Sequence, residues 1–541
     1  MKKVLFVLCL YAFGLFTIPK MVFAESYSYI KIRANNIAYE VLEGEIPEGV
    51  TYNESTNTLT LTNFTGSSLE ANGDYTIILE GENVLDDFYD GIIIRKGNLT
   101  IEGTGSLNAN CFVIEGNLEI NSGTISIDSQ HNGIDVEGDL TINDGIINVI
   151  SQEAGIEIDG NIVINKGTLT IEGKHIGISI NGNLTINGGA ISINSALGIV
   201  VESERISESG MSSFIINNGK LEVKTASEGI KLDKSNLKIN DGKITIQSKG
   251  ETAFEGIAQV ISDDYRPEMT MSGGSIVLDG FTYAICFGTK FKLAGSDILI
   301  KNSSKGITSY SGRSGGRQML DYFFLDSGSV IMKDFAEENN NYAIKITASN
   351  DETKEMIKYN SENIYVEDPR YDFRGEPVST DNEDIYLAEE DFISMYDTPE
   401  KIATNIKILS KYKIIEGDKQ TITNTAEGMR IEADIDNFVA LYINDELVGE
   451  DSYTLEEGST IIRLNDDYVQ NLEEGTYTIR AEFTTGYAEG TFEKTIAETT
   501  PEVEESETST PATGDKILYS IILFALSSIA IIFRKKIFNR I

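Results

Sequence analysis

Residues 133–154 read GIDVEGDLTINDGIINVISQEA, and residues 155–176 read GIEIDGNIVINKGTLTIEGKHI. The two stretches have the same length. Three glycines, at positions 133, 138 and 145, recur 22 residues later, as do aliphatic residues at six alternating positions. Gly116, Gly138, Gly160 and Gly182 extend the 22-residue spacing along the chain. A fixed period of this size is typical of a repeat architecture in which one structural unit is stacked on the next.

Each unit contains three short segments of alternating aliphatic and polar residues, as in Ile134/Val136, Leu140/Ile142 and Ile147/Val149. Such alternation is typical of strands with one buried face, and the Gly, Asn or Asp residues between the segments indicate turns. One layer cannot bury its aliphatic side chains alone, so the pattern predicts columns such as Ile134, Ile156 and Ile178. The sequence therefore predicts an all-β fold, a right-handed parallel β-helix with three strands per 22-residue coil.

A column of asparagines supports the same register. Asn121, Asn143, Asn165 and Asn187 lie 22 residues apart, each two residues before a glycine. We expect these side chains to turn inward and to hydrogen-bond from layer to layer.

Changes in composition divide the chain into domains. Residues 25–89 are predicted to form an N-terminal cap with the first layers, residues 90–340 the β-helix, and residues 341–411 a C-terminal cap and connector. Closely spaced strand patterns predict a small immunoglobulin-like β-sandwich over residues 412–496. Residues 497–509 are rich in Glu, Thr and Ser, and are predicted to be a disordered linker.

The N-terminal 24 residues are predicted to be a signal peptide. Lys2 and Lys3 precede an apolar run that ends at Ile18, and Val22-Phe23-Ala24 has the small-residue pattern of a secretory cleavage site. The sequence therefore predicts export.

Residues 510–541 combine a short motif, an uncharged run over 517–533 and a basic tail. The run is at the short limit of a membrane span, so we expect transient membrane contact. The motif Thr510-Pro511-Ala512-Thr513-Gly514 resembles the sorting signal of Gram-positive surface proteins, usually Leu-Pro-x-Thr-Gly, with Thr510 in place of Leu. This resemblance implies that a sortase cysteine attacks the Thr513 carbonyl and that Thr513 becomes amide-linked to peptidoglycan, which anchors the protein covalently to the cell wall. A plain C-terminal membrane anchor is the alternative.

Two further resemblances concern the folded domains. Residues 50–53 (VTYN), 57–61 (NTLTL) and 97–101 (GNLTI) resemble the bacterial carbohydrate-binding β-helix family of Firmicutes surface proteins, over roughly residues 27–340. Residues 412–496, with Glu457-Gly458-Ser459-Thr460, resemble the immunoglobulin-like hydrophilic modules of cellulosomal scaffold proteins. The first resemblance implies sugar binding, and the second implies a spacer or surface-interaction role.

The charge balance restricts the partners. With 44 Lys and Arg against 85 Asp and Glu, the net charge of −41 excludes a nucleic-acid partner. Cys111 and Cys286 lie about eight layers apart, too far for a disulfide, and are predicted to be buried. The sequence contains no motif for a metal or another cofactor.

Extra residues interrupt the period at three places, over Ser203–Ser213, Ile261–Glu268 and Ser311–Gln318, each after the same strand of its layer. Insertions at one corner of a solenoid commonly form its recognition surface. The candidate ligand edge that they carry consists of Arg205, Asp263, Asp264, Tyr265, Arg266, Arg313 and Arg317. Phe281, Tyr283, Tyr310 and Tyr322 lie nearby and could stack on sugar rings.

Two columns are candidates for catalytic or metal sites. Asp135 and Glu157 face outward in adjacent layers at about 5 Å, a separation that suits a retaining glycosidase, but no Arg or Lys lies in register with them. His131, Glu153 and His175 form another column, in which the histidines lie about 10 Å apart, too far to share one metal ion. We interpret both columns as solvated surface.

The sequence thus predicts a non-enzymatic, wall-anchored extracellular protein whose β-helix binds a glycan or a host-surface ligand. A β-helical polysaccharide lyase or glycosidase and a passive spacer of the cell surface are the two alternatives.

Overall fold

A computed structural model describes residues 28–86, 91–202, 211–250, 253–260, 267–309, 322–333, 342–345, 357–360, 364–367, 384–387 and 406–496. These residues form strands almost throughout, which confirms the predicted all-β class. No helix in this part of the chain is long and apolar enough to cross a membrane, and the predicted segment 517–533 lies outside it.

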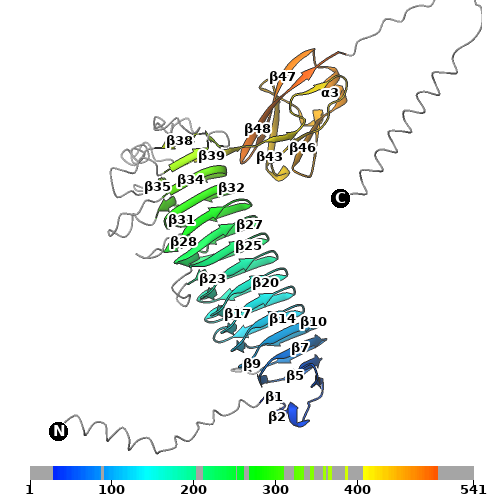
Figure 1. The fold of residues 1–541 in the computed structure, drawn as a ribbon, viewed down its shortest axis with the longest axis vertical. Coiled ribbons are helices and arrows are strands. Elements are labelled where there is room, and N and C mark those ends of the chain that lie inside the picture. The colour runs from blue at the N-terminus through cyan, green and yellow to red at the C-terminus, as the bar shows by residue number, and fades with distance from the viewer. Residues whose placement is uncertain are drawn as a thin grey trace, which may run out of the picture. The chain divides into compact units, whose positions relative to one another are not determined.

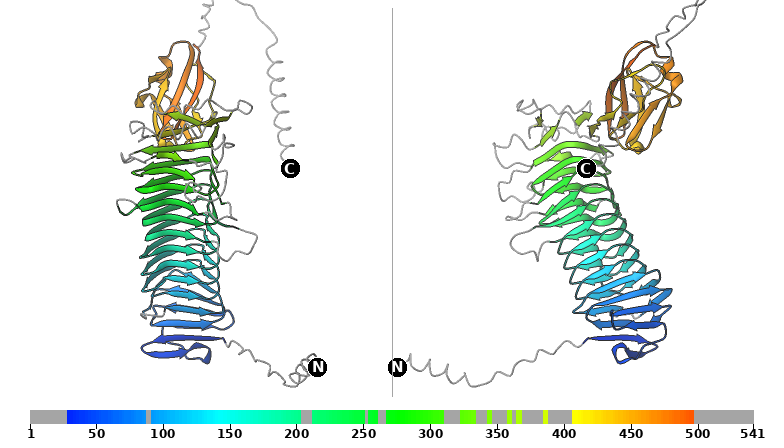
Figure 2. Two further views of the ribbon diagram at one scale, coloured as in Figure 1. Left: turned by 90° about the vertical axis from the view of Figure 1, so that its left-hand side faces the viewer. Right: turned by 45° about the vertical axis from the view of Figure 1, so that its right-hand side comes forward.

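Three strands recur in each coil and build three stacked sheets (Figures 1 and 2). Sheet I contains β4 (Thr58–Thr62), β7 (Tyr75–Glu80), β10 (Leu99–Gly103), β13 (Leu118–Ile120), β16 (Leu140–Ile142), β19 (Ile162–Ile164), β22 (Leu184–Ile186), β24 (Ser212–Ile216), β26 (Ser235–Ile239) and β29 (Glu268–Met271). The first halves of β32 (Lys290–Lys301) and β34 (Tyr322–Lys333) continue it. Every successive pair from β4 to β34 is parallel.

Sheet II follows sheet I in each coil. It contains β5 (Thr65–Gly66), β8 (Glu82–Leu85), β11 (Ser106–Ala109), β14 (Thr124–Ser129), β17 (Ile146–Ser151), β20 (Thr168–Gly173), the first halves of β23 (Ala190–Val201) and β25 (Lys220–Asp233), β27 (Lys243–Ser248), β30 (Ser275–Asp279) and the second halves of β32 and β34.

Sheet III completes the coil. It contains β6 (Ser68–Asn72), β9 (Ile92–Arg95), β12 (Phe112–Ile114), β15 (Ile134–Val136), β18 (Ala154–Ile158), β21 (Ile176–Ile180), the second halves of β23 and β25, β28 (Ala253–Val260), β31 (Phe281–Phe287), β33 (Lys305–Ser309) and β35 (Tyr342–Lys345).

The aliphatic columns hold the coils together. Ile134 pairs with Ile156 and Ile156 with Ile178, as the period predicted, and all three are at most 1% exposed. Each strand therefore exchanges backbone hydrogen bonds with two neighbouring coils while its apolar side chains share one dry interior. Cys111 and Cys286 are buried, as predicted.

The asparagine column bonds from coil to coil but lies at the surface. The side-chain amides of Asn143, Asn165 and Asn187 each donate to the preceding asparagine at 2.7–2.8 Å, and Asn217 and Asn240 continue the series. These side chains are half-buried or exposed, so their predicted inward orientation is wrong. The corner leaves room outside the core, whereas the interior is filled by aliphatic side chains.

Antiparallel strands close the N-terminal end of the coils. β1 (Tyr29–Ala34) pairs with β2 (Ile37–Glu40) and with β6, and β3 (Val50–Asn53) pairs with β4. The short helix η1 (Val41–Glu43) follows β2. This arrangement covers the strand edge that the first coil would otherwise expose.

At the other end, β36 (Ile357–Asn360) pairs with β34 and with β38 (Asp384–Leu387), and β37 (Ile364–Glu367) pairs with β39 (Ile406–Lys411). Residues 412–496 then enclose a second core, built from Ile431, Leu441, Ile462 and Val469 among others. One sheet contains β40 (Ile414–Glu416), β42 (Met429–Ile431), β46 (Thr460–Leu464) and β45 (Tyr453–Glu456). The other includes β41 (Gln420–Ile422), β43 (Phe438–Ile443), β44 (Glu446–Leu447), β47 (Gly475–Phe483) and β48 (Gly486–Lys494), and the remaining elements are η4 (Ile435–Asn437), η5 (Glu450–Ser452) and α3 (Asp466–Gln470).

Candidate functional site

The predicted ligand edge lies outside the described residues. This applies to Arg205, Asp263, Asp264, Tyr265, Arg266, Arg313 and Arg317, and also to the sorting motif Thr510, Pro511, Ala512, Thr513 and Gly514. The strands that flank the three insertions are described, and they place the insertions in the coil. Ser212 and Ser213 belong to β24, and Glu268 belongs to β29, so two of the insertions are shorter than predicted.

All three insertions leave sheet III and return to sheet I, at one corner of the coil. They separate β23 from β24, β28 from β29, and β33 from β34. The two intervening coils turn the same corner tightly: Lys234 alone separates β25 from β26, and Gly288-Thr289 separates β31 from β32. Insertions therefore occur on every second coil, a regularity that the sequence analysis missed.

A groove lies on the outer face of sheet I beside this corner. Its cavity volume is about 340 Å³, and it is lined by Met211, Ser213, Ile215, Asn236, Leu237, Lys238, Glu268 and Thr270. Met211 and Ile215 supply apolar surface, while hydroxyl, amide, ammonium and carboxylate groups supply donors and acceptors. A binding surface for a sugar needs this combination, because a pyranose ring has an apolar face and a rim of hydroxyl groups.

Hydrogen bonds hold the groove in shape. The Asn236 side chain accepts from the Glu268 backbone N–H at 2.8 Å, and the Asn183 side chain accepts from the Ser213 backbone N–H at 2.9 Å. The Glu268 carboxylate lies 3.4 Å from the Lys290 ammonium. Lys238 is exposed and has no ion-pair partner among the described residues, so its ammonium group is available to a ligand.

The next coils extend the polar surface. Lys292 lies 3.4 Å from the Asp326 carboxylate and over the Phe324 ring, with 5.3 Å between the ammonium and the ring centroid. Both contacts are partly exposed, so they orient the side chains more than they stabilise the fold.

Of the four aromatic residues predicted near the ligand edge, two have described side chains. Phe281 is fully buried in the core, so the prediction that it could face a ligand is wrong. Tyr283 lies on sheet III, where it accepts a hydrogen bond from Lys305 at 2.8 Å and packs edge-to-face on Phe254. Tyr310 and the Tyr322 side chain lie outside the described structure.

Charge is distributed unevenly along the coils. Residues 91–202 contain 13 acidic and 4 basic residues, whereas residues 203–321 contain 14 acidic and 15 basic residues. The groove thus lies in the coils whose charge is close to balanced, although the whole chain is strongly acidic. Repulsion of an anionic ligand by the protein's own charge is therefore weaker there than in the preceding coils.

Gln259 supports the groove from inside the core, a role that was not predicted from the sequence pattern. It lies inside the core, opposite Leu232 of the preceding coil, and is fully buried. Its side-chain amide donates to the Ser235 and Glu268 carbonyls at 3.1 and 3.0 Å and accepts from the Gly288 N–H at 3.0 Å. It therefore connects three successive corners and holds Glu268 at the rim of the groove. The signal that could have revealed it is a polar residue directly after Leu232 in a column that is aliphatic up to that coil.

Asp135 and Glu157 pair in register on the outer face of sheet III, as predicted. The Asn132 side chain donates to Asp135 at 3.4 Å and also to Glu157. Burial raises the pKa of Asp135, and the charge of Asp159 adds a smaller upward shift. Burial and the charges of Asp135 and Asp159 raise the pKa of Glu157. The carboxyl groups thus carry an electrostatic cost when both are ionised.

We expect Asp135→Asn to unfold at a higher urea concentration than the natural chain near neutral pH. A carboxyl with a raised pKa favours folding below about pH 4 and opposes it as pH rises through the folded value. The difference between the two chains should therefore vanish in acid. Asp128→Asn, at an exposed position of sheet II, is the control; equal midpoints for Asp135→Asn and the natural chain at neutral pH would contradict the expectation.

His131, Glu153 and His175 follow one another on adjacent coils, with backbone hydrogen bonds between them. The His131 ring lies 3.4 Å from the Glu153 carboxylate, and both side chains are more than half exposed. Within the described part of the chain, no group of three or more His, Cys, Asp or Glu residues is arranged to hold a metal ion.

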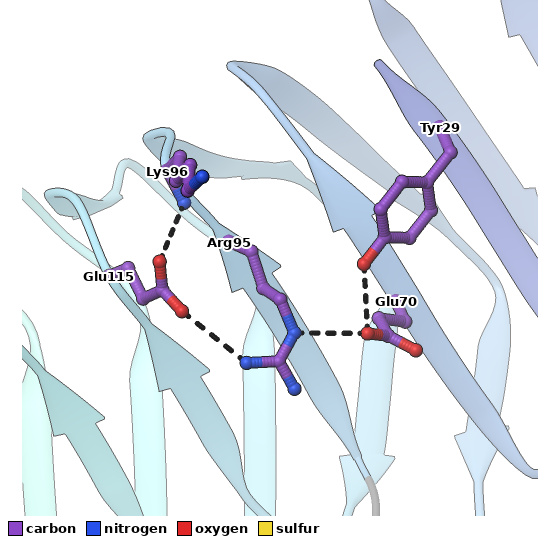
Figure 3. Close-up of polar contacts among 5 residues, drawn as sticks. All are labelled: Tyr29, Glu70, Arg95, Lys96 and Glu115. Carbon is purple, nitrogen blue, oxygen red and sulfur yellow. Dashed lines mark hydrogen bonds and ion pairs between the residues drawn. The ribbon is translucent and has the colours of Figure 1, made fainter. Parts of the chain in front are cut away.

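A polar cluster on the first coils connects sheet III to the N-terminal cap (Figure 3). The Glu70 carboxylate accepts from the Tyr29 hydroxyl at 2.8 Å and from Arg95 at 3.0 Å, and Arg95 also lies 3.3 Å from Glu115. Although burial alone would raise it, the hydrogen bonds from Arg95 and Tyr29 hold the pKa of Glu70 below its usual range. The charges and hydrogen-bonding groups of these side chains are paired with one another, so we interpret this cluster as structural.

Comparison with known proteins places the chain in a family. The model of a family described as "Carbohydrate-binding domain-containing protein" matches residues 50–252 and 153–365. The two overlapping matches agree with a repeated unit and together cover more than half of the chain. The searches of curated proteins and of solved structures found no match. The groove lies within the matched residues, and the chain belongs to the family of carbohydrate-binding domain-containing proteins.

Proposed function

We propose that this chain is a secreted Gram-positive surface protein that binds a glycan through the groove on sheet I. The observation that carries the proposal is the groove of residues 211–270 within the family match, beside the corner where the insertions occur. Apolar surface from Met211 and Ile215 in the lining, with polar groups on three adjacent strands, is suited to a sugar ring.

The coils constitute a right-handed parallel β-helix in this proposal. The parallel pairing of each strand with its equivalents one coil away supports the β-helix, and right-handed connections between parallel strands are strongly preferred. Residues 412–496 constitute the immunoglobulin-like module, supported by their two sheets and separate core.

A glycan array tests the function. We expect the full-length chain to bind at least one glycan, and Lys238→Ala to reduce that affinity about tenfold, equivalent to about 1.4 kcal/mol. Lys243→Ala, another exposed lysine but on sheet II, should bind as the natural chain does. Loss of binding in Tyr265→Ala/Arg266→Ala would extend the site to the second insertion. If the natural chain binds none of the bacterial and host glycans on the array, a passive spacer is favoured instead.

The enzymatic alternative has its own test. The Asp135–Glu157 pair is bridged by Asn132 and has no neighbouring cation in register, which supports a non-catalytic role. We expect no release of reducing ends or unsaturated products from a polysaccharide panel. Turnover that disappears in Asp135→Asn would overturn this part of the proposal.

Anchoring is proposed from the motif at residues 510–514 and the apolar run that follows. In the producing bacterium, Thr513→Ala should move the protein from the covalent wall fraction to the medium or the membrane fraction. An unchanged wall fraction would exclude sortase cleavage at Thr513.

A further inference from the structure

The outer face of sheet I repeats every second coil beside the insertion corner. Its central column reads Ile215, Lys238, Thr270, Lys292 and Phe324, and each residue is the direct strand partner of the next. The two lysines lie on the coils that turn the corner tightly, and the other three residues lie on the coils that carry insertions. In this column, coils with a tight corner therefore carry a lysine, and coils with an insertion carry another residue.

This alternation fixes the distance between the two lysines. Neighbouring strands lie about 4.8 Å apart, so Lys238 and Lys292 are separated by roughly 10 Å along the coil axis. That separation is comparable to the length of a disaccharide unit in an extended polysaccharide. Two successive units of such a polymer would each meet one lysine, whereas a single terminal sugar would use one of the two.

The surface between the two lysines is continuous. Glu268 and Thr270 belong both to the groove around Lys238 and to the strand beside β32, which carries Lys290 and Lys292. The Lys290–Glu268 ion pair is half exposed on both sides, so hydroxyl groups of a ligand can reach its donors and acceptors. At the far end, the Lys292 ammonium lies over the partly buried Phe324 ring, so Phe324 adds an aromatic group to this end of the column.

We infer that the site takes an extended linear polysaccharide, lying lengthwise along the column from Ile215 to Phe324, in place of a terminal sugar or a branched epitope. One subsite centres on Lys238 and the second on Lys292, one for each two-coil repeat. This inference rests on the proposed glycan binding and adds the form and direction of the ligand. Two linked subsites raise the affinity of a long chain because its second contact is intramolecular.

The test measures the affinity of the full-length chain for oligosaccharide ladders from dimers to octamers, of neutral, amino-sugar and acidic β-linked polymers. For the ladder that binds, we expect the affinity to rise more than tenfold once the oligomer is long enough to reach both lysines. Lys238→Ala and Lys292→Ala should each abolish most of this rise, and Lys243→Ala on sheet II should preserve it.

The outcomes separate the inference from the function on which it rests. If dimers bind as tightly as octamers, or if Lys292→Ala leaves the rise with length intact, lengthwise binding is wrong although glycan binding stands. If no ladder and no array glycan binds, glycan binding itself fails. The inference is supported if the affinity rises with oligomer length in the natural chain and in Lys243→Ala, and if this rise is lost in both Lys238→Ala and Lys292→Ala.

Discussion

Replacing Gln259 with leucine will destabilise the coils around the groove, although leucine is the more hydrophobic residue and Leu232 occupies the equivalent position one coil earlier. The substitution removes the partners of the Ser235 and Glu268 carbonyls and of the Gly288 N–H, all bonded to the Gln259 side chain. A buried backbone group left without a partner costs about 1–3 kcal/mol, so we expect a loss of about 3 kcal/mol or more. Chemical unfolding of the full chain, with hydrogen exchange at residues 235, 268 and 288, measures it.

Leu232→Met is the matched control, because it changes the same column at nearly constant volume and should cost less than about 1.5 kcal/mol.

Asn83 is a second buried amide that bonds to the backbone of neighbouring coils. It is fully buried, donates to the Glu80 and Ser106 carbonyls and accepts from the Phe64 N–H. Asn83→Leu should lose comparable stability near the N-terminal coils and leave glycan affinity unchanged, whereas Gln259→Leu should lower both. Full stability of Gln259→Leu would show that water replaces the amide.

Gly177→Ala is expected to cost about 3 kcal/mol, through overpacking of a tightly filled interior. An added Cβ atom would lie 2.3 Å from Ile193 Cγ2 and 2.6 Å from the Gly198 carbonyl oxygen. The carbonyl belongs to the backbone of the next coil, so it cannot move without breaking the pairing of β21 with β23. Glycine is needed here for close approach of two coils.

Gly250→Ala is the control for this prediction, because no atom lies within 4 Å of the added Cβ position. We expect its unfolding midpoint to change little or to rise slightly, since alanine restricts the unfolded chain. Equal midpoints for Gly177→Ala and the natural chain would mean that the coils can separate locally without loss of stability.

The alternating insertions illustrate why part of the candidate site could not be predicted. Three breaks in the period are visible in the sequence at one corner, and β23/β24, β28/β29 and β33/β34 flank them. The groove itself was missed, because Ser213, Asn236 and Glu268 lie in different coils and look like ordinary outward strand residues. Only the stacking of β24, β26 and β29 makes them neighbours.

The sequence by itself determined the all-β class, the three strands per coil and the columns of Ile134, Ile156 and Ile178. These features follow from local alternation and a constant period, which a linear pattern records directly. The tertiary structure alone decided the surface position of the asparagine ladder, the burial of Phe281 and the role of Gln259. Each of these depends on the space and the hydrogen-bond partners that neighbouring coils leave at one corner, and those partners are many residues away along the chain.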